Sequence, residues 1–350
     1  MYVEENKPLA PFTTFGVGGP ARWFTEARSE DDVAPAVTWA QEKSVPLFLL
    51  GGGSNLLIAD RGLKGLVLRV GLKGVERHNH AAELVYQVAA GEDWDSFVQR
   101  TIADGCAGLE CLAGIPGTVG GTPVQNVGAY GQEVADAIEH VRAYDLQKGR
   151  FVEFPAAECR FAYRRSRFNT DDRERYVVTR VDYRLRLGGS PTLGYADLQR
   201  EFAERPTPSL DEVAQAVRRI RRSKGMLLVE GDPDCHSAGS FFKNPVISRE
   251  RLPGLTQVAG KEPPRFPAAK GTGPDAVKVP AAWLIEQAGF AKGFIQGQAG
   301  ISTRHTLALI NRGGAKAMEI LALANDIASR VEVRFGIRLE IEPVLLGFDI

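Results

Sequence analysis

The stretch from Gly114 to Gly131 reads GIPGTVGGTPVQNVGAYG, and neither a helix nor a sheet ladder tolerates so many glycines and prolines. A fully solvated loop would not carry so many apolar residues either. We therefore interpret this stretch as backbone that lies along a long, flat and partly apolar ligand.

A second glycine cluster, GGGSN at 51–55, follows the short apolar run 47–50, which we predict to be a buried strand. Consecutive small residues at such a point can expose several backbone N–H groups in one concavity, and this nest binds a diphosphate without net charge. Taken alone, the cluster is better explained as a tight turn between strands. Two glycine-rich loops that are separate in sequence together favour one extended dinucleotide such as FAD.

The spacing of apolar residues predicts several regular elements. A helix is expected after Ser29, since apolar residues recur with helical spacing over 33–40. Alternation of apolar and charged residues over 177–187 predicts a half-exposed strand. A long amphipathic helix that starts near residue 320 should end at Gly336, and a strand over 337–342 should follow it.

The composition excludes several classes of protein. The 350 residues are 44% hydrophobic and 25% charged, which is typical of a globular protein of two to three domains. The 43 basic and 43 acidic residues leave no net charge, which argues against binding to nucleic acid or to a membrane surface. No apolar run approaches the roughly 18 residues of a membrane span, and the N-terminus lacks a signal-peptide core. We expect a cytoplasmic protein.

Cysteine and histidine give no sign of a metal site. The four cysteines form no CxxC pair, and the five histidines show no spacing that suits metal ligands. We therefore expect no bound metal.

Further motifs follow one another along nearly the whole chain, and with the two glycine clusters they resemble UDP-N-acetylenolpyruvoylglucosamine reductases. They are TFGVGG (14–19), GLE (108–110), CRFAYR (159–164), SFFKNP (240–245), AWLI (282–285) and EPV (342–344). The sequence GYADL at 194–198 resembles the tyrosine-bearing loop of the longer subclass of this family. Segment 226–234 departs from the family pattern because it is longer and more acidic. The resemblance therefore does not determine the detail of the substrate-entry loop.

The resemblance implies an α+β protein with a two-subdomain FAD-binding fold, like that of vanillyl-alcohol-oxidase and PCMH-type flavoproteins, followed by a C-terminal α+β substrate-binding domain. Residues 1–72 would form the first flavin subdomain, completed by the C-terminal strand 337–350. Residues 73–208 would form the second subdomain, and residues 209–336 would bind the substrate.

The resemblance also implies a reaction. The substrate is the enolpyruvyl ether of UDP-N-acetylglucosamine, and the product is UDP-N-acetylmuramate, a peptidoglycan precursor. NADPH is the co-substrate, FAD is bound without a covalent link, and hydride passes from the reduced flavin to the enolpyruvyl group. We expect a monomer.

The site residues are carried over motif by motif. The expected FAD contacts are Gly51, Gly52, Gly53, Ser54, Asn55, Ile115, Pro116, Gly117, Gly120, Gly128, Ala129, Tyr130 and Gly131. The expected contacts to the uridine diphosphate are Lys224, Lys243 and Asn244, with Tyr195 closing over them.

Three residues are expected to act on the enolpyruvyl group. Arg164 would pair with its carboxylate through two parallel hydrogen bonds. Ser240 would donate the proton to C2, and Glu342 would hydrogen-bond the developing enolic acid while protonated. Each has a simpler explanation: one surface arginine among several, an ordinary turn serine, and a carboxylate on a solvated strand face.

The basic run 218–222 also has a simple explanation. It ends a predicted helix, where cations complement the helix dipole and are usually solvated. For the protein as a whole, two different functions stay open. It could be another FAD-dependent oxidoreductase or oxidase with the same flavin fold, or a non-catalytic UDP-sugar-binding homologue.

Overall fold

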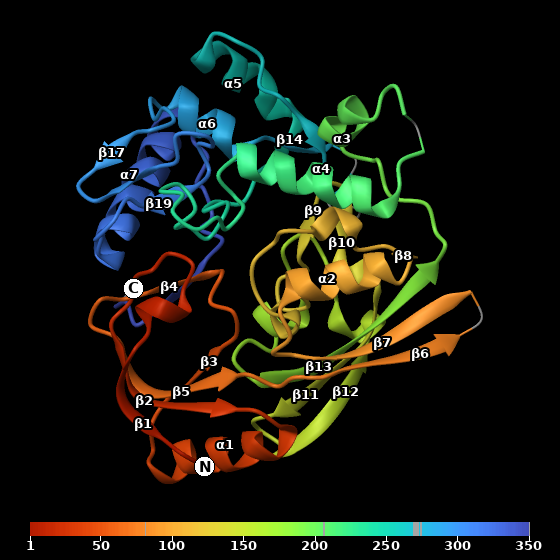
Figure 1. The fold of residues 1–350 in the computed structure, drawn as a ribbon. Coiled ribbons are helices and arrows are strands. Elements are labelled where there is room, and N and C mark those ends of the chain that lie inside the picture. The colour runs from red at the N-terminus through yellow and green to blue at the C-terminus, as the bar shows by residue number, and fades with distance from the viewer. Residues whose placement is uncertain (81, 206, 269–272, 274, 350) are drawn as a thin grey trace. The chain divides into compact units, whose positions relative to one another are not determined.

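The computed structural model describes residues 1–80, 82–205, 207–268, 273 and 275–349 (Figure 1). It divides into two compact units, each assembled from several stretches of chain. The first unit comprises Met1–Lys7, Ala21–Gly53 and Lys64–Arg222, and the second comprises Pro8–Pro20, Ser54–Leu63 and Ser223–Ile350. This division rests on packing, and the three-domain boundaries expected from the sequence stay a prediction.

The first unit contains a four-stranded sheet in the order β1-β2-β5-β3. Its strands are β1 (Glu4–Pro8), β2 (Pro20–Ala27), β5 (Leu63–Val70) and β3 (Leu47–Leu50), and β3 runs parallel to β5. Helix α1 (Val33–Glu42) buries the predicted apolar face in one cluster with Leu66 and Leu68 of β5. The helix after Ser29 and the strand before the first glycine loop are therefore confirmed.

A larger antiparallel sheet forms the rest of this unit, in the order β12-β11-β13-β7-β6, with the short β8 beside β13. Its strands are β6 (Val75–His80), β7 (Glu83–Ala89), β8 (Cys106–Ala107), β11 (Ile138–Asp145), β12 (Arg150–Pro155) and β13 (Tyr176–Leu187). Helix α2 (Trp94–Ala103) packs Trp94 and Phe97 against Tyr183 of β13.

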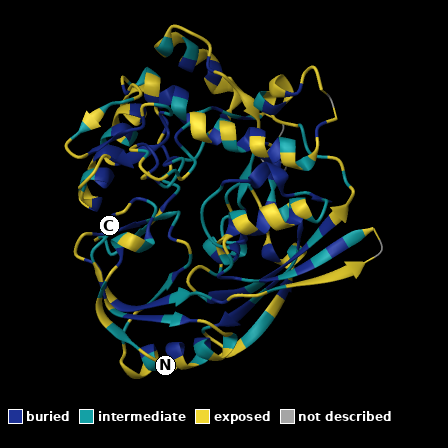
Figure 2. Cartoon of the chain, in the orientation of Figure 1, coloured by how far each residue is buried: buried dark blue, intermediate teal, exposed yellow. Residues whose placement is uncertain are grey.

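Strand β13 corrects one expectation. It is a strand, as the alternation predicts, but most of its residues are buried rather than alternately exposed (Figure 2). It pairs with β11 and β7 on its two sides. Its residues enter two core clusters, one shared with α2 and the other with α1, so packing covers both of its faces.

Two helices and a short ribbon complete the first unit. Strands β9 (Gly128–Ala129) and β10 (Gln132–Glu133) pair with each other at the end of the long glycine-rich stretch. Helices α3 (Ala196–Glu201) and α4 (Leu210–Ser223) bury their apolar faces in a cluster that includes Tyr130.

The second unit packs around helix α7 (Ala317–Phe335), which ends at Gly336 in the left-handed conformation, as predicted. The other helices are α5 (Leu252–Ala259) and α6 (Ala281–Gln287). Its short strands are β4 (Leu56–Ile58), β14 (Val246–Ser248), β15 (Phe266–Pro267), β16 (Ala276–Lys278), β17 (Ile295–Gln296), β18 (Ala299–Ile301), β19 (Leu309–Asn311) and β20 (Val344–Leu346).

The predicted strand over 337–342 is wrong. Ile337 and Leu339 are buried in the core of the second unit, but only Ile341 joins a ladder, as an isolated bridge to Phe242. The C-terminal strand is β20, and it pairs in parallel with β4. Apolar alternation indicated burial here without specifying a partner strand, and a strand needs that partner.

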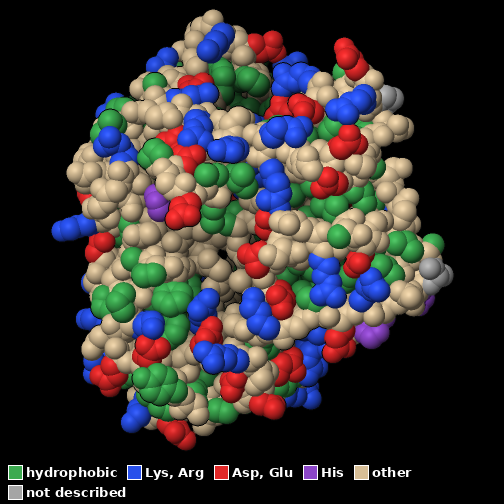
Figure 3. All heavy atoms as spheres, viewed as in Figure 1, with side chains coloured by type: hydrophobic (Ala, Val, Ile, Leu, Met, Phe, Trp, Pro, Cys, Tyr) green, Lys and Arg blue, Asp and Glu red, His purple; other side chains and the backbone are tan. Residues whose placement is uncertain are grey.

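Short 3-10 helices connect these elements. They are η1 (Ala10–Phe12), η2 (Glu30–Asp32), η3 (Glu110–Leu112), η4 (Val119–Gly121), η5 (Val134–Asp136), η6 (Ala156–Cys159), η7 (Arg167–Asn169) and η8 (Arg249–Arg251). Basic and acidic side chains are interspersed on the face shown in Figure 3, as the zero net charge suggests. Within the described ranges, no helix has both the length and the apolarity to cross a bilayer.

The start of α7 generates a prediction about stability. The Asp60 carboxylate accepts hydrogen bonds from the N–H groups of Ala317 (2.8 Å) and Met318 (3.1 Å), which no helical carbonyl can reach. Asp60→Ala should lower the free energy of unfolding by about 1 kcal/mol, measured by urea denaturation. Asp326→Ala, which removes an exposed ion pair on the same helix, should cost less than about 0.5 kcal/mol. Equal losses in the two variants would contradict this capping role.

Candidate functional site

The two glycine-rich loops of the first unit lie in direct backbone contact. A Cβ atom on Gly52 would lie 2.7 Å from the Gly117 Cα, and one on Gly51 would lie 2.9 Å from the Thr118 Oγ1. Real Cβ atoms do not approach so closely, so glycine at these positions lets the loops meet. The structure thus brings together the two stretches that the sequence predicted to serve one ligand.

The first loop carries the donors that a diphosphate needs. Among the described residues, no acceptor meets the backbone N–H groups of Gly51, Gly52 and Gly53. Gly53 has a φ of 63° and Gly117 a φ of 131°, both of which favour glycine. This arrangement of successive N–H groups and left-handed glycines suits an anion nest, and it fits the diphosphate of FAD.

Ser54 and Asn55, predicted as FAD contacts, belong to the second unit. The Ser54 carbonyl accepts a hydrogen bond from the Thr14 hydroxyl at 3.4 Å, and the Asn55 carbonyl accepts one from the Val344 N–H at 2.9 Å. Their backbone therefore connects the TFGVGG motif with the C-terminal strand.

The long glycine-rich stretch is fixed at its first residue by a half-buried carboxylate and a buried guanidinium. The Gly114 N–H donates to the Asp95 carboxylate at 2.6 Å, and the Gly114 carbonyl accepts from the Arg221 Nε at 3.0 Å. Arg218 pairs with the same Asp95 at 2.6 Å. Arg221 is only 8% exposed, and its burial lowers the pKa of the guanidinium. The expectation of a solvated basic helix end is therefore wrong for these two arginines.

The middle of the stretch packs tightly on the large sheet. A Cβ on Gly120 would lie 2.5 Å from the Ala90 Cβ, and the Gly120 N–H donates to the Ala90 carbonyl at 2.8 Å. Ile115 packs on the core of this sheet, and Pro116 is half-buried. The glycine is needed here because no side chain fits.

Arg164 reaches the end of the same stretch. Its Nη1 donates to the Gly128 carbonyl at 2.9 Å, and its guanidinium carbon lies 5.6 Å from the centroid of the Tyr163 ring. Arg164 has a φ of 57°, a left-handed conformation that is uncommon for arginine and is often seen at functional sites.

Side-chain hydrogen bonds hold the Arg164 loop against the glycine-rich stretch. Asn126 Nδ2 donates to the Ala162 carbonyl at 3.1 Å, and Ser166 Oγ donates to the Val124 carbonyl at 2.7 Å. Both donors are buried. The loop that carries Arg164 is therefore positioned by the predicted flavin-binding backbone itself.

In the second unit, hydrogen bonds join the SFFKNP and EPV motifs, which are about a hundred residues apart. The Glu342 N–H donates to the Phe241 carbonyl and the Lys243 N–H donates to the Glu340 carbonyl, both at 2.9 Å. These bonds place the backbone of Ser240 beside the segment that bears Glu342. Two of the three predicted catalytic residues thus come from one paired segment.

Two predicted substrate contacts already have partners within the protein. The Lys243 ammonium pairs with the Glu340 carboxylate. The Asn244 Oδ1 accepts a hydrogen bond from the Ala281 N–H at 2.9 Å, at the start of α6, which leaves the Asn244 amide NH2 group as the part that can donate to a ligand. Arg164 and Tyr195 belong to the first unit, and Lys224, Lys243 and Asn244 to the second.

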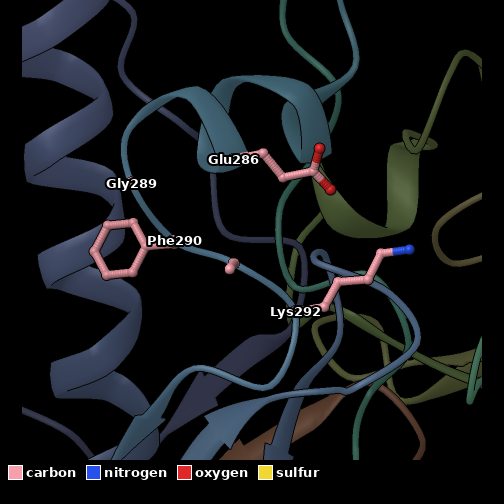
Figure 4. A pocket seen from close by; sticks show the side chains of 5 residues that line it. Glu286, Gly289, Phe290 and Lys292 are labelled. Atoms are coloured by element: carbon pink, nitrogen blue, oxygen red, sulfur yellow. The ribbon is translucent and has the colours of Figure 1, made fainter.

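A pocket of about 520 Å³ lies beside α6, lined by Glu286, Gly289, Phe290, Ala291 and Lys292 (Figure 4). Burial, Lys224 and Lys292 lower the pKa of the nearby His305 to about 4, so its imidazole is neutral at pH 7. Lys224, Lys292 and the Glu286 carboxylate, which acts in the opposite direction on His305, therefore share one neighbourhood. The sequence analysis missed Lys292 and His305, because no spacing connects them to Lys224.

A cluster of His140, Glu153 and Asp182 on the large sheet places potential ligand atoms within 4.8 Å of one another. Arg180 already pairs with both carboxylates, at 3.2 Å to Glu153 and 2.7 Å to Asp182. A metal ion there would face the guanidinium charge, so we assign no metal site to this cluster.

Comparison with known proteins gives consistent results. A family model described as the C-terminal domain of UDP-N-acetylenolpyruvoylglucosamine reductase matches residues 232–346, and one described as an FAD binding domain matches residues 21–155. Reductases of that name from Streptomyces coelicolor and Thermobifida fusca are 46% and 45% identical to this chain. Each match covers 98% of this chain, and 90% and 97% of the two relatives.

A solved structure gives the same result. The crystal structure of UDP-N-acetylenolpyruvylglucosamine reductase from Thermus caldophilus has a TM-score of 0.66 at 28% identity, covering 99% of this chain and 100% of that one. The α+β class and the FAD-binding fold expected from the sequence are confirmed.

The contact between the two loops predicts that a larger side chain at position 52 reduces FAD binding. Gly52→Val should weaken FAD binding by roughly tenfold or more, because overpacking commonly costs about 1–3 kcal/mol. The cost of the substitution is steric and does not come from backbone conformation, because Gly53 has a positive φ and Gly52 does not. Flavin released by acid precipitation measures occupancy, and non-covalent FAD should leave no colour in the pellet. Gly254→Ala, whose Cβ meets nothing within 4 Å, should keep full occupancy. Normal occupancy in Gly52→Val would show that the contact does not matter for FAD.

Proposed function

The chain belongs to the UDP-N-acetylenolpyruvoylglucosamine reductase family, and on that premise we propose that it reduces the enolpyruvyl ether of UDP-N-acetylglucosamine to UDP-N-acetylmuramate, with NADPH as reductant. It is an FAD-dependent oxidoreductase. The observation that carries the proposal is the pair of contacting glycine-rich loops with Arg164 fixed on one of them. FAD, when bound, supplies the hydride chemistry.

Arg164 is the residue that we propose binds the enolpyruvyl carboxylate. Its Nη1 is hydrogen-bonded to the Gly128 carbonyl, which orients the guanidinium plane before substrate arrives. A planar guanidinium can pair with a carboxylate through two parallel bonds, and it stabilises the negative charge that develops there during reduction.

We propose that Ser240 donates the proton and that Glu342 stabilises the developing enolate by a hydrogen bond. Ser240 Oγ–H would protonate C2, whose carbanion character makes it a strong enough base for a hydroxyl donor. The Glu342 carboxyl group, while protonated, would donate a hydrogen bond to the developing enolate oxygen. The hydrogen bond between the Glu342 N–H and the Phe241 carbonyl supports a shared task.

The basic residues of the second unit suit the diphosphate of the substrate. We propose that Lys224, Lys243 and the Asn244 amide bind it, with Tyr195 covering the nucleotide. Lys292 adds a cation near Lys224, since both lower the pKa of His305. A neutral His305 adds no charge of its own, and the Glu286 carboxylate offsets part of the positive charge of the two lysines.

The remaining parts of the proposal concern the partners and the setting. The enzyme would use NADPH, act as a monomer and work in the cytoplasm on a peptidoglycan precursor. Purified protein should oxidise NADPH continuously only when the enolpyruvyl nucleotide is also present. Oxidation of NADPH at the same rate without the nucleotide would favour a different FAD oxidase, and no oxidation at all would favour a non-catalytic homologue.

The role proposed for Arg164 predicts that lysine cannot replace it. Arg164→Lys should lower turnover about 100- to 1,000-fold, because an ammonium does not reproduce the planar two-bond geometry. Steady-state kinetics with the enolpyruvyl nucleotide measures the loss. Arg160→Lys in the same loop, where the arginine is exposed and pairs with Asp171, should turn over normally. Near-normal turnover of Arg164→Lys would rule out the two-bond role.

The role proposed for Ser240 predicts that the two half-reactions separate. Ser240→Ala should bleach the flavin with NADPH at a near-normal rate and then stall with the enolpyruvyl nucleotide, because only the second step needs the proton. Rapid-mixing absorbance resolves the two phases. Ser240→Cys should recover part of the second phase, and the exposed Ser248→Ala should change neither. If Ser240→Ala slows both phases equally, Ser240 only shapes the site.

A further inference from the structure

A buried carboxylate lies beneath the loop that carries Tyr195. The Glu110 side chain is fully buried and accepts hydrogen bonds from the Gly108 N–H at 2.7 Å, the Gln132 Nε2 at 2.7 Å and the Thr192 N–H at 2.8 Å. In the part of the chain that the structure describes, no lysine or arginine pairs with it. Convergent neutral donors of this kind are what a buried carboxylate requires.

The same network fastens Thr192 at three atoms. Its N–H donates to Glu110, its Oγ1 accepts from the Gln132 Nε2 at 3.1 Å, and its carbonyl accepts from the Cys111 thiol at 3.3 Å. The Gln132 Oε1 in turn accepts from the Cys111 N–H at 2.8 Å. Thr192 is therefore bound to η3 and to β10, which directly follows the glycine-rich stretch.

Tyr195 lies three residues beyond this fastening point and is 38% exposed. Its ring meets the Tyr130 ring edge-on, with centroids 5.2 Å apart. A Cβ on Gly131 would lie 3.7 Å from the Tyr195 backbone nitrogen, so the loop backbone rests on the end of the glycine-rich stretch. Thr192 thus supplies a polar attachment, made by three hydrogen bonds, for the loop that carries Tyr195.

We propose that Glu110 is a positioning residue for the sugar nucleotide: its carboxylate holds the Thr192 peptide and thereby presents Tyr195 to the substrate. This inference rests on the proposed function, in which Tyr195 covers the nucleotide. Glu110 itself is fully buried, so we infer that it acts through Thr192 and not by direct contact with the substrate. It also joins the Tyr195 loop to the flavin-binding backbone, since Gln132 bonds both Glu110 and Thr192.

The geometry requires a carboxylate rather than its isosteric amide. Both Glu110 oxygens act as acceptors, Oε2 for Gly108 and Oε1 for Gln132 and Thr192. Glutamine would turn one acceptor into an NH2 donor that faces another N–H group. The substitution therefore breaks at least one buried bond and keeps the volume.

The test compares Glu110→Gln with wild type in the FAD-loaded enzyme. The KM for the enolpyruvyl nucleotide should rise about tenfold, because loss of a hydrogen bond to a charged group commonly has at least that effect. Its Kd, from the change in flavin absorbance on titration, should rise by the same factor. Flavin reduction by NADPH and FAD occupancy should stay near wild type. Glu201→Gln, which removes an exposed carboxylate on α3 next to the loop, should leave the KM unchanged.

A double-mutant cycle separates this role from general loosening of the fold. If Glu110 acts through Tyr195, adding Glu110→Gln to Tyr195→Ala should raise the KM little beyond Tyr195→Ala alone. Independent, multiplicative effects would overturn the proposal, as would slower flavin reduction or loss of FAD with an unchanged KM.

A second variant covers the case in which Glu110→Gln does not fold. Thr192→Gly leaves the buried carboxylate in place, removes the acceptor of Gln132 and frees the loop backbone. It should raise the KM in the same direction with normal FAD content, and an unchanged KM would overturn the proposal. Failure of the proposed function is distinct, since wild type would then neither bind nor reduce the enolpyruvyl nucleotide.

Discussion

The close approach of two backbones, at Gly52 and Gly117, is the constraint on which the flavin-binding unit depends. A Cβ on Gly52 would lie 2.7 Å from the Gly117 Cα, so the loops can meet only where side chains are missing. Such a contact gains little by itself, because glycine backbone buries little apolar area and loses much conformational freedom on folding. The surrounding structure must therefore hold both loops in place.

Polar side chains do this at both ends of the long stretch, and Arg221 and Glu110 among them are buried. Asp95 and Arg221 bind the two sides of the Gly114 peptide, and Glu110 binds Gln132 just after the stretch ends. Polar groups are suited to this task because irregular backbone has N–H and C=O groups that no ladder satisfies, and leaving them unpaired inside the protein is costly. Glu110 also binds Thr192 in the loop that carries Tyr195, and Asn126, within the long stretch, binds the Ala162 carbonyl in the loop that carries Arg164. Both loops are therefore attached to the framework of the glycine-rich stretch.

Apart from the exposure of β13, local sequence pattern misled in two places for one physical reason. The basic run of α4 was expected to be solvated, yet Arg221 is buried because the Gly114 carbonyl requires a donor. Residues 337–342 were expected to form a strand. Only Ile341 pairs with another segment, through an isolated bridge to Phe242. Local pattern reports how apolar a segment is, whereas its hydrogen-bonding partners come from distant parts of the chain.

Apolar spacing and glycine content are local properties, and they were enough to predict helices α1 and α7, the β3 strand and the two glycine-rich loops. The motifs added the α+β class and indicated Arg164, Ser240 and Glu342 as candidates. Three-dimensional packing was needed to show that the two loops touch, that the Asn244 Oδ1 caps α6, and that Glu110 binds Thr192. Each of these contacts joins residues far apart along the chain, and a buried polar group takes whatever partner the fold brings within hydrogen-bond distance.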